Sequence, residues 1–596
     1  MREGARAGKA IFRGQPLAPG SLSLHRRELL LAGLSLPVAT MLPVRALAAS
    51  ASTSLAPVAE GRFDDGSVPA LAAALAAAAY RPPSRELPAV LAGIDYDRYR
   101  DYRYNDARAL WHGQGRGFEA QFFHRGYMFL DRVDMHVVED GRSRRFAYSP
   151  ELFRFDHGVS SPPEGEDIGF AGFRLHGLLQ DAGARQQGAR LDEVAAFLGG
   201  SYFRAVARGL GYGLSARGLA LGSGDPGAEE FPVFRAFWLE TPARGATSIV
   251  VHALLDSPSV AGAFRFAITP GDDTVFDVDA RLYPRVELVA AGIAPLTSMY
   301  EFDAGDRAGI DDPRPAVHDS DGLALLSGSG EQAWRPLRNP GTVEHSGFQD
   351  RDPKGFGLMQ RKRRFEDYQD LEAGYEKRPG CWVEPLDAWG EGEVHLVEIP
   401  TANEYADNIV AFWRPRLPLA PGREHRWRYR LHWTAGHGWN PRLARVVATR
   451  SGALDGADGR QYFIDFRGDH LPATDGAVRV QAAASAGVLR NAVAYRNPHD
   501  GSWRVGFELE PGPAQAVEMR LWLEGDAGRL SETWLSRGTP CPRARRRRPR
   551  GSRVARCRRC RPSRRCRCRC RPSGTARWSI RRGLPRRRTW PGAASP

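Results

Sequence analysis

The chain has 596 residues, with 84 basic and 69 acidic side chains and a net charge of +15. Residues 536–596 hold 23 arginines and no acidic residue, so residues 1–535 carry a net charge of −8, from 61 basic and 69 acidic side chains. A mildly acidic body argues against a nucleic-acid-binding surface, and a chain of this length predicts more than one domain.

The N-terminal region carries the parts of a cleavable export signal within residues 25–50. Arg26 and Arg27 precede an apolar run at residues 29–42, and Ala46-Leu47-Ala48 has the small-residue pattern of a cleavage site. The apolar run has about 14 residues, fewer than the ~20 that a membrane-spanning helix needs. A buried core helix is the alternative, but a polar, proline-containing stretch follows the run where a packing partner would be needed.

The paired arginines favour the twin-arginine (Tat) route over the general secretory route. We therefore interpret residues 1–48 as a Tat signal with an N-terminal extension. We expect the Tat translocon to be a partner during export and the mature protein to be periplasmic.

Residues 57–413 are predicted to form a large β-sandwich domain. Helical periodicity is confined to residues 71–80 and 193–198, which predict short helices. Elsewhere, short apolar or alternating runs lie between clusters of Gly, Pro, Asp and Asn, a pattern typical of all-β sandwiches. The clearest of these strand patterns are at residues 248–255, 263–269, 275–282 and 394–399.

A proline-rich stretch at residues 413–424 predicts a domain boundary. Strand patterns then recur at residues 426–433, 462–466, 478–483, 503–509 and 516–523. Their number and spacing are typical of one immunoglobulin-like sandwich. We therefore predict an all-β chain whose second domain spans residues 423–535.

Residues 536–596 contain six of the seven cysteines and almost no apolar side chains. Cys557 and Cys560 have the spacing of a zinc-ligand pair, but no second pair lies at zinc-finger spacing. Such a segment cannot offset its ordering entropy by burying apolar surface. We interpret it as an Arg/Cys-rich disordered tail, translated out of frame, and expect no nucleic-acid partner; an RNA-binding tail is the alternative.

Three regions concentrate carboxylates, aromatic rings and arginines, the residue types of a sugar-binding cleft. They are residues 317–321, 365–389 and 398–409, and Asp-rich turns between strands are the alternative interpretation. The chain carries no phosphate-binding loop, dinucleotide fingerprint or His-Glu-x-x-His motif, and it lacks the serine-hydrolase elbow. We therefore expect neither a metal nor another cofactor.

Many separated motifs, in the same order, make the chain resemble the family of periplasmic glucans biosynthesis proteins D and G. One is Gly-Phe-Ala-Gly-Phe-Arg at residues 169–174, and others lie at residues 120–124, 197–206, 212–220, 292–299, 353–358, 378–379 with 382–385, and 407–413. The twin arginines favour the Tat-exported protein D branch. The resemblance implies a mutarotase-like β-sandwich followed by an immunoglobulin-like domain, and β-1,2-linked periplasmic glucan as the bound polysaccharide.

The resemblance also implies an enzyme that cleaves or transfers β-1,2-glucan with inversion at the anomeric carbon. It places the general acid on Asp407, the general base on Asp319 and a supporting acidic residue on Glu404. We expect a raised pKa for Asp407 and an ionised Asp319. The predicted substrate-binding residues are Tyr375, Arg378, Trp382, Glu384, Trp389 and His318.

Two alternatives stay open at this point. The same cleft would serve a non-catalytic glucan-binding protein that guides elongation or branching of the glucan. Hydrolysis and transfer are not distinguished, because exclusion of water from the acceptor site decides between them. The resemblance also makes a homodimer a reasonable expectation.

Overall fold

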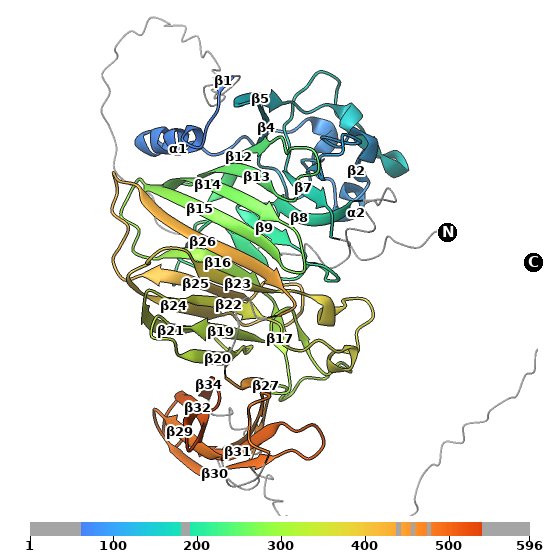
Figure 1. Cartoon of the computed structure of the whole chain (residues 1–596). Helices are drawn as coiled ribbons and strands as arrows, with labels where there is room; N and C mark the ends of the chain where they lie inside the picture. Colours follow the sequence, from blue (N-terminus) through green and yellow to red (C-terminus); the bar gives the residue numbers. More distant parts are fainter. Residues whose placement is uncertain (1–60, 180–190, 437–442, 455–458, 474–477, 539–596) are drawn as a thin grey trace, which may run out of the picture. The chain divides into compact units, whose positions relative to one another are not determined.

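The computed structural model describes residues 61–179, 191–436, 443–454, 459–473 and 478–538, and the export signal and the tail beyond residue 538 lie outside these ranges. The described residues form an all-β fold, as predicted, with two large sheets packed into a sandwich (Figure 1). Its helices are short: α1 (Ser67–Ala77), α2 (Tyr96–Tyr99) and the 3-10 turns η1 (Ala89–Leu91), η2 (Asp106–Arg108), η3 (Pro150–Leu152), η4 (Asp156–Gly158), η5 (Phe365–Asp367) and η6 (Tyr375–Lys377). No helix in the described part is long and apolar enough to cross a membrane.

The larger sheet of the described residues has 16 strands, most of them antiparallel. In spatial order they are β1 (Gly61–Arg62), β5 (Arg142–Phe146), β4 (Asp134–Glu139), β12 (Val233–Glu240), β13 (Ile249–Asp256), β14 (Val260–Thr269), β15 (Thr274–Pro284), β26 (His425–Thr434), β23 (Gly380–Pro385), β22 (Gly355–Met359), β19 (Gly322–Leu326), β20 (Gln332–Pro336), β34 (Thr533–Gly538), β32 (Val517–Gly525) and β29 (Arg479–Ala484), with β33 (Gly528–Arg529) paired to β32.

The facing sheet has ten strands within the same ranges. In order they are β21 (Glu344–Arg351), β24 (Glu391–Glu398), β25 (Ile409–Pro415), β16 (Ala291–Ser298), β10 (Ser215–Arg217), β9 (Tyr202–Ala205), β8 (Asp192–Leu198), β7 (Gly172–Gly177) and β3 (Phe118–Phe123), with β11 (Ala220–Leu221) paired to β16. Two short pairs accompany it, β17 (Tyr300–Phe302) with β18 (Val317–His318) and β2 (Tyr102–Tyr104) with β6 (Phe153–Phe155).

Aromatic side chains from both sheets fill the space between them. Phe203 on β9 contacts Phe266 on β14 at a ring-centroid distance of 5.1 Å, and Phe276 on β15 contacts Trp433 on β26 at 4.7 Å. Every second residue of β15 is buried, as period-2 patterning requires when one face of a strand covers a core. Each fully buried ring contributes roughly 1.5–3 kcal/mol of hydrophobic stabilisation, so this aromatic layer fixes the sandwich.

A second, smaller sandwich encloses a second core, to which strands of the larger sandwich also contribute. The sheet β27 (Arg445–Ala453), β28 (Arg460–Arg467), β31 (Trp503–Glu510) and β30 (Val488–Arg496) packs against β34, β32 and β29. Tyr462, Phe507 and Trp534 are buried in this core. Parallel pairing of β34 with β20 makes the edge of the small sandwich continuous with the larger sheet.

Several predicted elements are confirmed and others are corrected. The strands predicted at residues 248–255, 263–269, 275–282 and 394–399 are β13, β14, β15 and β24. The helix predicted at residues 71–80 is α1, which begins four residues earlier. The helix predicted at residues 193–198 is wrong: this segment is β8, because pairing with β7 and β9 and burial of Phe197 outweigh its weak helical pattern.

The predicted division at residues 413–424 is also corrected. The strand expected to open the small domain, residues 426–433, is β26 and pairs with β15 and β23 of the large sandwich. The prolines of the preceding stretch therefore mark the crossing from β25 of one sheet to β26 of the other. At the far end, Ser536, Arg537 and Gly538 belong to β34 and not to the tail.

Candidate functional site

Asp319 lies in a tight turn that joins β18 to β19. Its backbone N–H donates to the Met299 carbonyl at 2.9 Å, and its side chain is only 7% exposed. The Arg378 guanidinium, held just after η6, donates to one carboxylate oxygen. Burial raises the pKa of the Asp319 carboxyl, Arg378 opposes this, and the negative charge of Asp407 raises that pKa further. The two predicted catalytic carboxylates are thus close enough to interact electrostatically.

Asp407 immediately precedes Asn408, which fixes the loop before β25. The Asn408 amide accepts from the Tyr300 N–H at 2.8 Å and donates to the carbonyls of Tyr300 and Ile399, each at 2.9 Å. The Asp407 side chain stays 39% exposed, and its carboxylate lies 3.9 Å from the Arg204 guanidinium. The loop therefore presents a solvent-accessible carboxylate next to an arginine.

Arg204 lies on the face of the ten-stranded sheet that points away from the core. Its neighbours in β9, Phe203 and Ala205, are buried in the sandwich core, so alternation directs Arg204 to the opposite face. The guanidinium Nε donates to the Ser215 hydroxyl on β10 at 2.6 Å. Arg204 is thereby held in place to pair with Asp407.

Glu404 is the centre of a second group of contacts. One of its oxygens accepts from the Tyr375 hydroxyl at 2.7 Å and from the Arg314 guanidinium at 2.6 Å. Arg314 also bonds Asp370 at 2.9 Å. The Arg378 guanidinium lies 4.5 Å from the centre of the Tyr375 ring. Glu404 therefore supports Tyr375, which in turn packs against the arginine that binds Asp319.

The structure brings five of the nine predicted site residues together: Asp319, Asp407, Glu404, Tyr375 and Arg378. His318 is not accessible in this arrangement. Its ring is fully buried, stacked on Tyr300 at 5.4 Å and edge-on to Tyr368 at 5.1 Å. Burial lowers its pKa to about 3, so it remains neutral at physiological pH behind Asp319.

The other three predicted substrate-binding residues lie elsewhere. Trp382 is 1% exposed in the core shared by the two sandwiches, and Trp389 is 7% exposed in the main core. Glu384 is on the outer face of the large sheet, where it pairs with His432 at 3.0 Å. These three assignments to the cleft are therefore corrected. A local cluster of aromatic and acidic residues in the sequence does not determine which sheet face each side chain occupies.

Sequence reasoning missed Arg204, Ser215 and Arg314 as members of the site. Arg204 lies inside one of the family-matching stretches, residues 197–206, where strand alternation could have separated it from its buried neighbours. Arg314 has no such signal, because its contact with Glu404 joins residues 90 positions apart.

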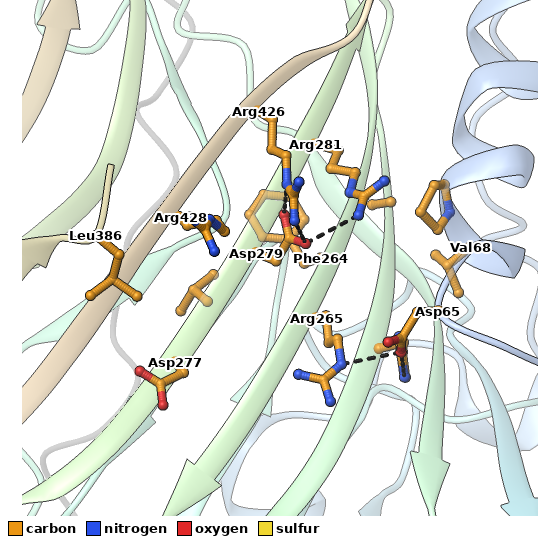
Figure 2. Close-up of a pocket in the computed structure, with 14 residues that line it drawn as sticks. Asp65, Val68, Phe264, Arg265, Asp277, Asp279, Arg281, Leu386, Arg426 and Arg428 are labelled. Carbon is orange, nitrogen blue, oxygen red and sulfur yellow. Dashed lines mark hydrogen bonds and ion pairs between the residues drawn. The ribbon is translucent and has the colours of Figure 1, made fainter. Parts of the chain in front are cut away.

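A hollow of about 320 Å³ opens on the outer face of the large sheet, and none of the nine predicted residues lines it. Figure 2 shows arginines and aspartates from β14, β15 and β26 in this hollow, with α1 at one side. Arg426 pairs with Asp279 at 2.8 Å, and Arg265 pairs with Asp65 at 3.2 Å. This hollow is separate from the Asp319–Asp407 site.

Comparison with known proteins gives a consistent result. The family described as "Periplasmic glucan biosynthesis protein, MdoG" matches residues 63–537. "Glucans biosynthesis protein G" of Rhodopseudomonas palustris is 48% identical over 518 residues, which is 87% of this chain and all of that protein. The protein of the same name in Bradyrhizobium diazoefficiens is 45% identical, also over 87% of this chain and all of its own length.

A third relative, glucans biosynthesis protein G of Vibrio cholerae, is 46% identical over 80% of this chain and 87% of its own length. These relatives are named protein G, so they do not support the closer resemblance to the protein D branch that the twin arginines suggested. A family match across both sandwiches, with near-half identity over whole relatives, establishes membership: the chain belongs to the MdoG family of periplasmic glucan biosynthesis proteins.

Proposed function

We propose that this protein shapes the backbone of periplasmic glucans by cleaving or transferring β-1,2-glucan with inversion at the anomeric carbon. Asp407 would be the general acid, Asp319 the general base, and Glu404 a positioning residue that acts through Tyr375. The observation that supports the proposal is a chain of contacts between two segments 88 positions apart. Arg378 bonds the buried Asp319 and packs against Tyr375, whose hydroxyl bonds Glu404, three residues before the accessible Asp407.

The chemistry of inversion requires two carboxyl groups in different protonation states. Asp407 would donate a proton to the glycosidic oxygen as its bond to the anomeric carbon breaks. Asp319 would accept a proton from a water molecule whose oxygen bonds to that carbon from the opposite face. For transfer, a sugar hydroxyl takes the place of the water.

The surroundings of each carboxylate support these roles. The Arg378 guanidinium favours the charged form of Asp319, which a base needs, and so opposes the burial and the Asp407 charge that raise the pKa of that carboxyl. Asp407 is exposed enough to reach a polysaccharide chain, and Arg204 beside it can neutralise the carboxylate that remains after the proton is donated. Tyr405, next to Glu404 in the chain, is 51% exposed and offers a ring face for stacking on a pyranose.

The test is release of reducing ends from purified linear β-1,2-glucan. We expect turnover by the wild type and a loss of about 10²–10⁴-fold in both Asp407→Asn and Asp319→Asn, the range for removal of a general acid or base. Both variants should retain glucan affinity by calorimetry, because the amide keeps the side chain's shape. The first-formed product should carry the α-anomer, as inversion of a β-linkage demands.

A matched control is Asp387→Asn, which removes an exposed carboxylate that pairs with Arg428 on the outer face of the large sheet. Its activity should equal that of the wild type. If wild type and both site variants bind glucan but release no product, the enzymatic proposal fails and the non-catalytic glucan-binding role takes its place.

A further inference from the structure

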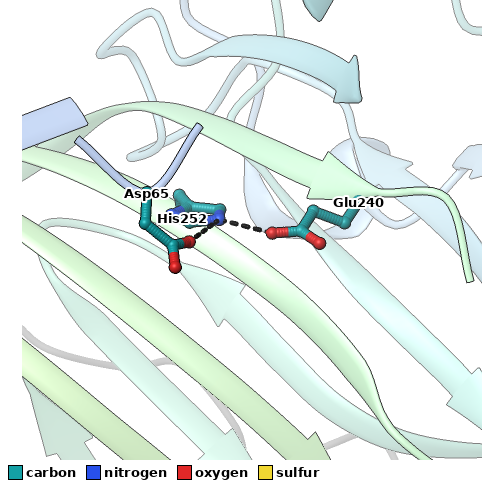
Figure 3. Close-up of side chains that lie close together, drawn as sticks. All are labelled: Asp65, Glu240 and His252. Carbon is teal, nitrogen blue, oxygen red and sulfur yellow. Dashed lines mark hydrogen bonds and ion pairs between the residues drawn. The ribbon is translucent and has the colours of Figure 1, made fainter. Parts of the chain in front are cut away.

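His252 lies between two carboxylates on the outer face of the large sheet (Figure 3). Its Nε2 is 2.7 Å from a Glu240 oxygen and 3.9 Å from an Asp65 oxygen. The three residues come from separate elements: Glu240 ends β12, His252 lies in β13, and Asp65 precedes α1. One imidazole nitrogen and two carboxylate oxygens, all within 4.8 Å of one another, form a candidate ligand set for a metal.

The spacing of these atoms fits a metal with small adjustments. Bonds of about 2.1 Å at about 90° place neighbouring ligand atoms ~3 Å apart, and opposite ligand atoms lie ~4.2 Å apart. The observed separations of 2.7 Å and 3.9 Å lie within 1 Å of the ~3 Å expected between neighbouring ligand atoms. The Asp65 side chain is 71% exposed and so is free of packing that would prevent its rotation toward an ion.

Burial prepares His252 for this role. The ring is 2% exposed and meets Phe63 edge-on at a centroid distance of 5.1 Å, so its orientation is fixed by packing. Asp65 and His252 also line the hollow of Figure 2, through which an ion and its remaining water ligands are reached from solvent. One ligand is therefore rigid, and the site keeps open positions.

We propose that Asp65, Glu240 and His252 bind a divalent transition-metal ion of the kind that accepts nitrogen and oxygen ligands, such as Mn²⁺, Fe²⁺ or Zn²⁺. This site is independent of the proposed glucan chemistry. It also revises the expectation from the sequence that no metal is bound, because the three ligands are spread over nearly 190 positions and form no motif.

The bound ion would attach the N-terminal end of α1 to the sheet. The opposite end of α1 is already held by Arg285, whose guanidinium donates to the carbonyls of Leu75 at 2.7 Å and Ala78 at 3.2 Å. Near the other end, Asp65 is held by an exposed pair with Arg265 at 3.2 Å, and such pairs contribute little. A metal would thus replace a weak attachment with a strong one.

Arg265 also provides a distinctive prediction. Its guanidinium contacts the same Asp65 oxygen that lies nearest His252, so an ion would compete with it for this oxygen and be repelled by its positive charge. Removing its charge by Arg265→Gln should therefore strengthen metal binding several-fold. Loss of a ligand, by Asp65→Asn or Glu240→Gln, should weaken metal binding at least tenfold.

The experiment uses the full chain without an affinity tag and titrates it with Mn²⁺, following the signal of the free aquo ion by electron paramagnetic resonance. Mn²⁺ is the right probe because the tail cysteines offer thiolates, which favour Zn²⁺ and bind Mn²⁺ poorly. We expect one bound ion per chain and a rise in Tm of the wild type that Asp65→Asn does not show.

Asp64→Asn is the matched control, because it removes the adjacent charge but keeps the oxygen that accepts from the Gly66 N–H at 3.0 Å. It should bind Mn²⁺ within twofold of the wild type. The proposal is overturned if the wild type binds no Mn²⁺ at millimolar concentration. Equal affinities of Asp64→Asn and Asp65→Asn would overturn it too, by showing only diffuse attraction between charges.

Discussion

The two sandwiches are joined by a buried ion pair whose removal has a calculable cost. Arg361 and Glu532 have side chains 5% and 1% exposed, and the Arg361 guanidinium lies 3.6 Å from the centre of the Trp334 ring. Glu532 also accepts from the Val446 N–H at 2.8 Å, which holds β27 beside β34. Glu532→Gln removes the charge while keeping the size of the side chain and an oxygen for Val446.

The expected cost follows from this burial. Removing one partner of a buried pair leaves an uncompensated charge and costs about 3–5 kcal/mol. Because the substituted amide would still accept one hydrogen bond from Arg361 or Val446, we expect the lower end, about 3 kcal/mol. Since 1.4 kcal/mol is a factor of ten, protection of the Val446 amide from hydrogen exchange should fall by roughly 100-fold.

The assay combines urea unfolding followed by circular dichroism with native-state hydrogen exchange of β27. Glu510→Gln is the matched control, because its carboxylate forms an exposed pair with Arg490, with side chains 41% and 54% exposed, in the same small sandwich. That change should cost at most about 1 kcal/mol. Equal losses of unfolding free energy in the two variants would refute the inference that burial makes the Arg361–Glu532 pair contribute more to stability than an exposed pair.

Three further predictions concern the site, the core and export. In Arg378→Met, loss of the positive charge beside Asp319 should raise the pKa of that carboxyl, so the acidic limb of the kcat/KM profile should move to higher pH; an unmoved limb would remove Asp319 as the base. Cys381 is fully buried and burial raises the pKa of its thiol, so peptide mapping should find it unalkylated by iodoacetamide in native protein and alkylated after unfolding. Replacing Arg26 and Arg27 with lysine should keep the precursor out of the periplasmic fraction, and undiminished export would exclude the Tat route.

The amino-acid sequence by itself determined the fold class and most of the strands. Strand β15 can be predicted from the alternation of its residues alone, because one face of the strand is buried and the other is partly exposed to solvent. The family resemblance also pointed to Asp319, Asp407, Glu404, Tyr375 and Arg378 as site residues, although only Arg378 and Asp407 lie within the shared motifs. The family membership suggested by those motifs is confirmed by the comparisons.

Only the tertiary structure decided what covers each face of a strand. Trp382 and Glu384 are two residues apart, and both side chains point away from the main core. The small sandwich covers Trp382, whereas Glu384 faces solvent. The same limit assigned the predicted strand at residues 426–433 to the wrong domain, because the hydrogen-bonding partners of β26 in β15 and β23 lie about 150 and 50 positions away. Pairing and burial at such separations depend on the whole chain's packing, and a local pattern carries no information about them.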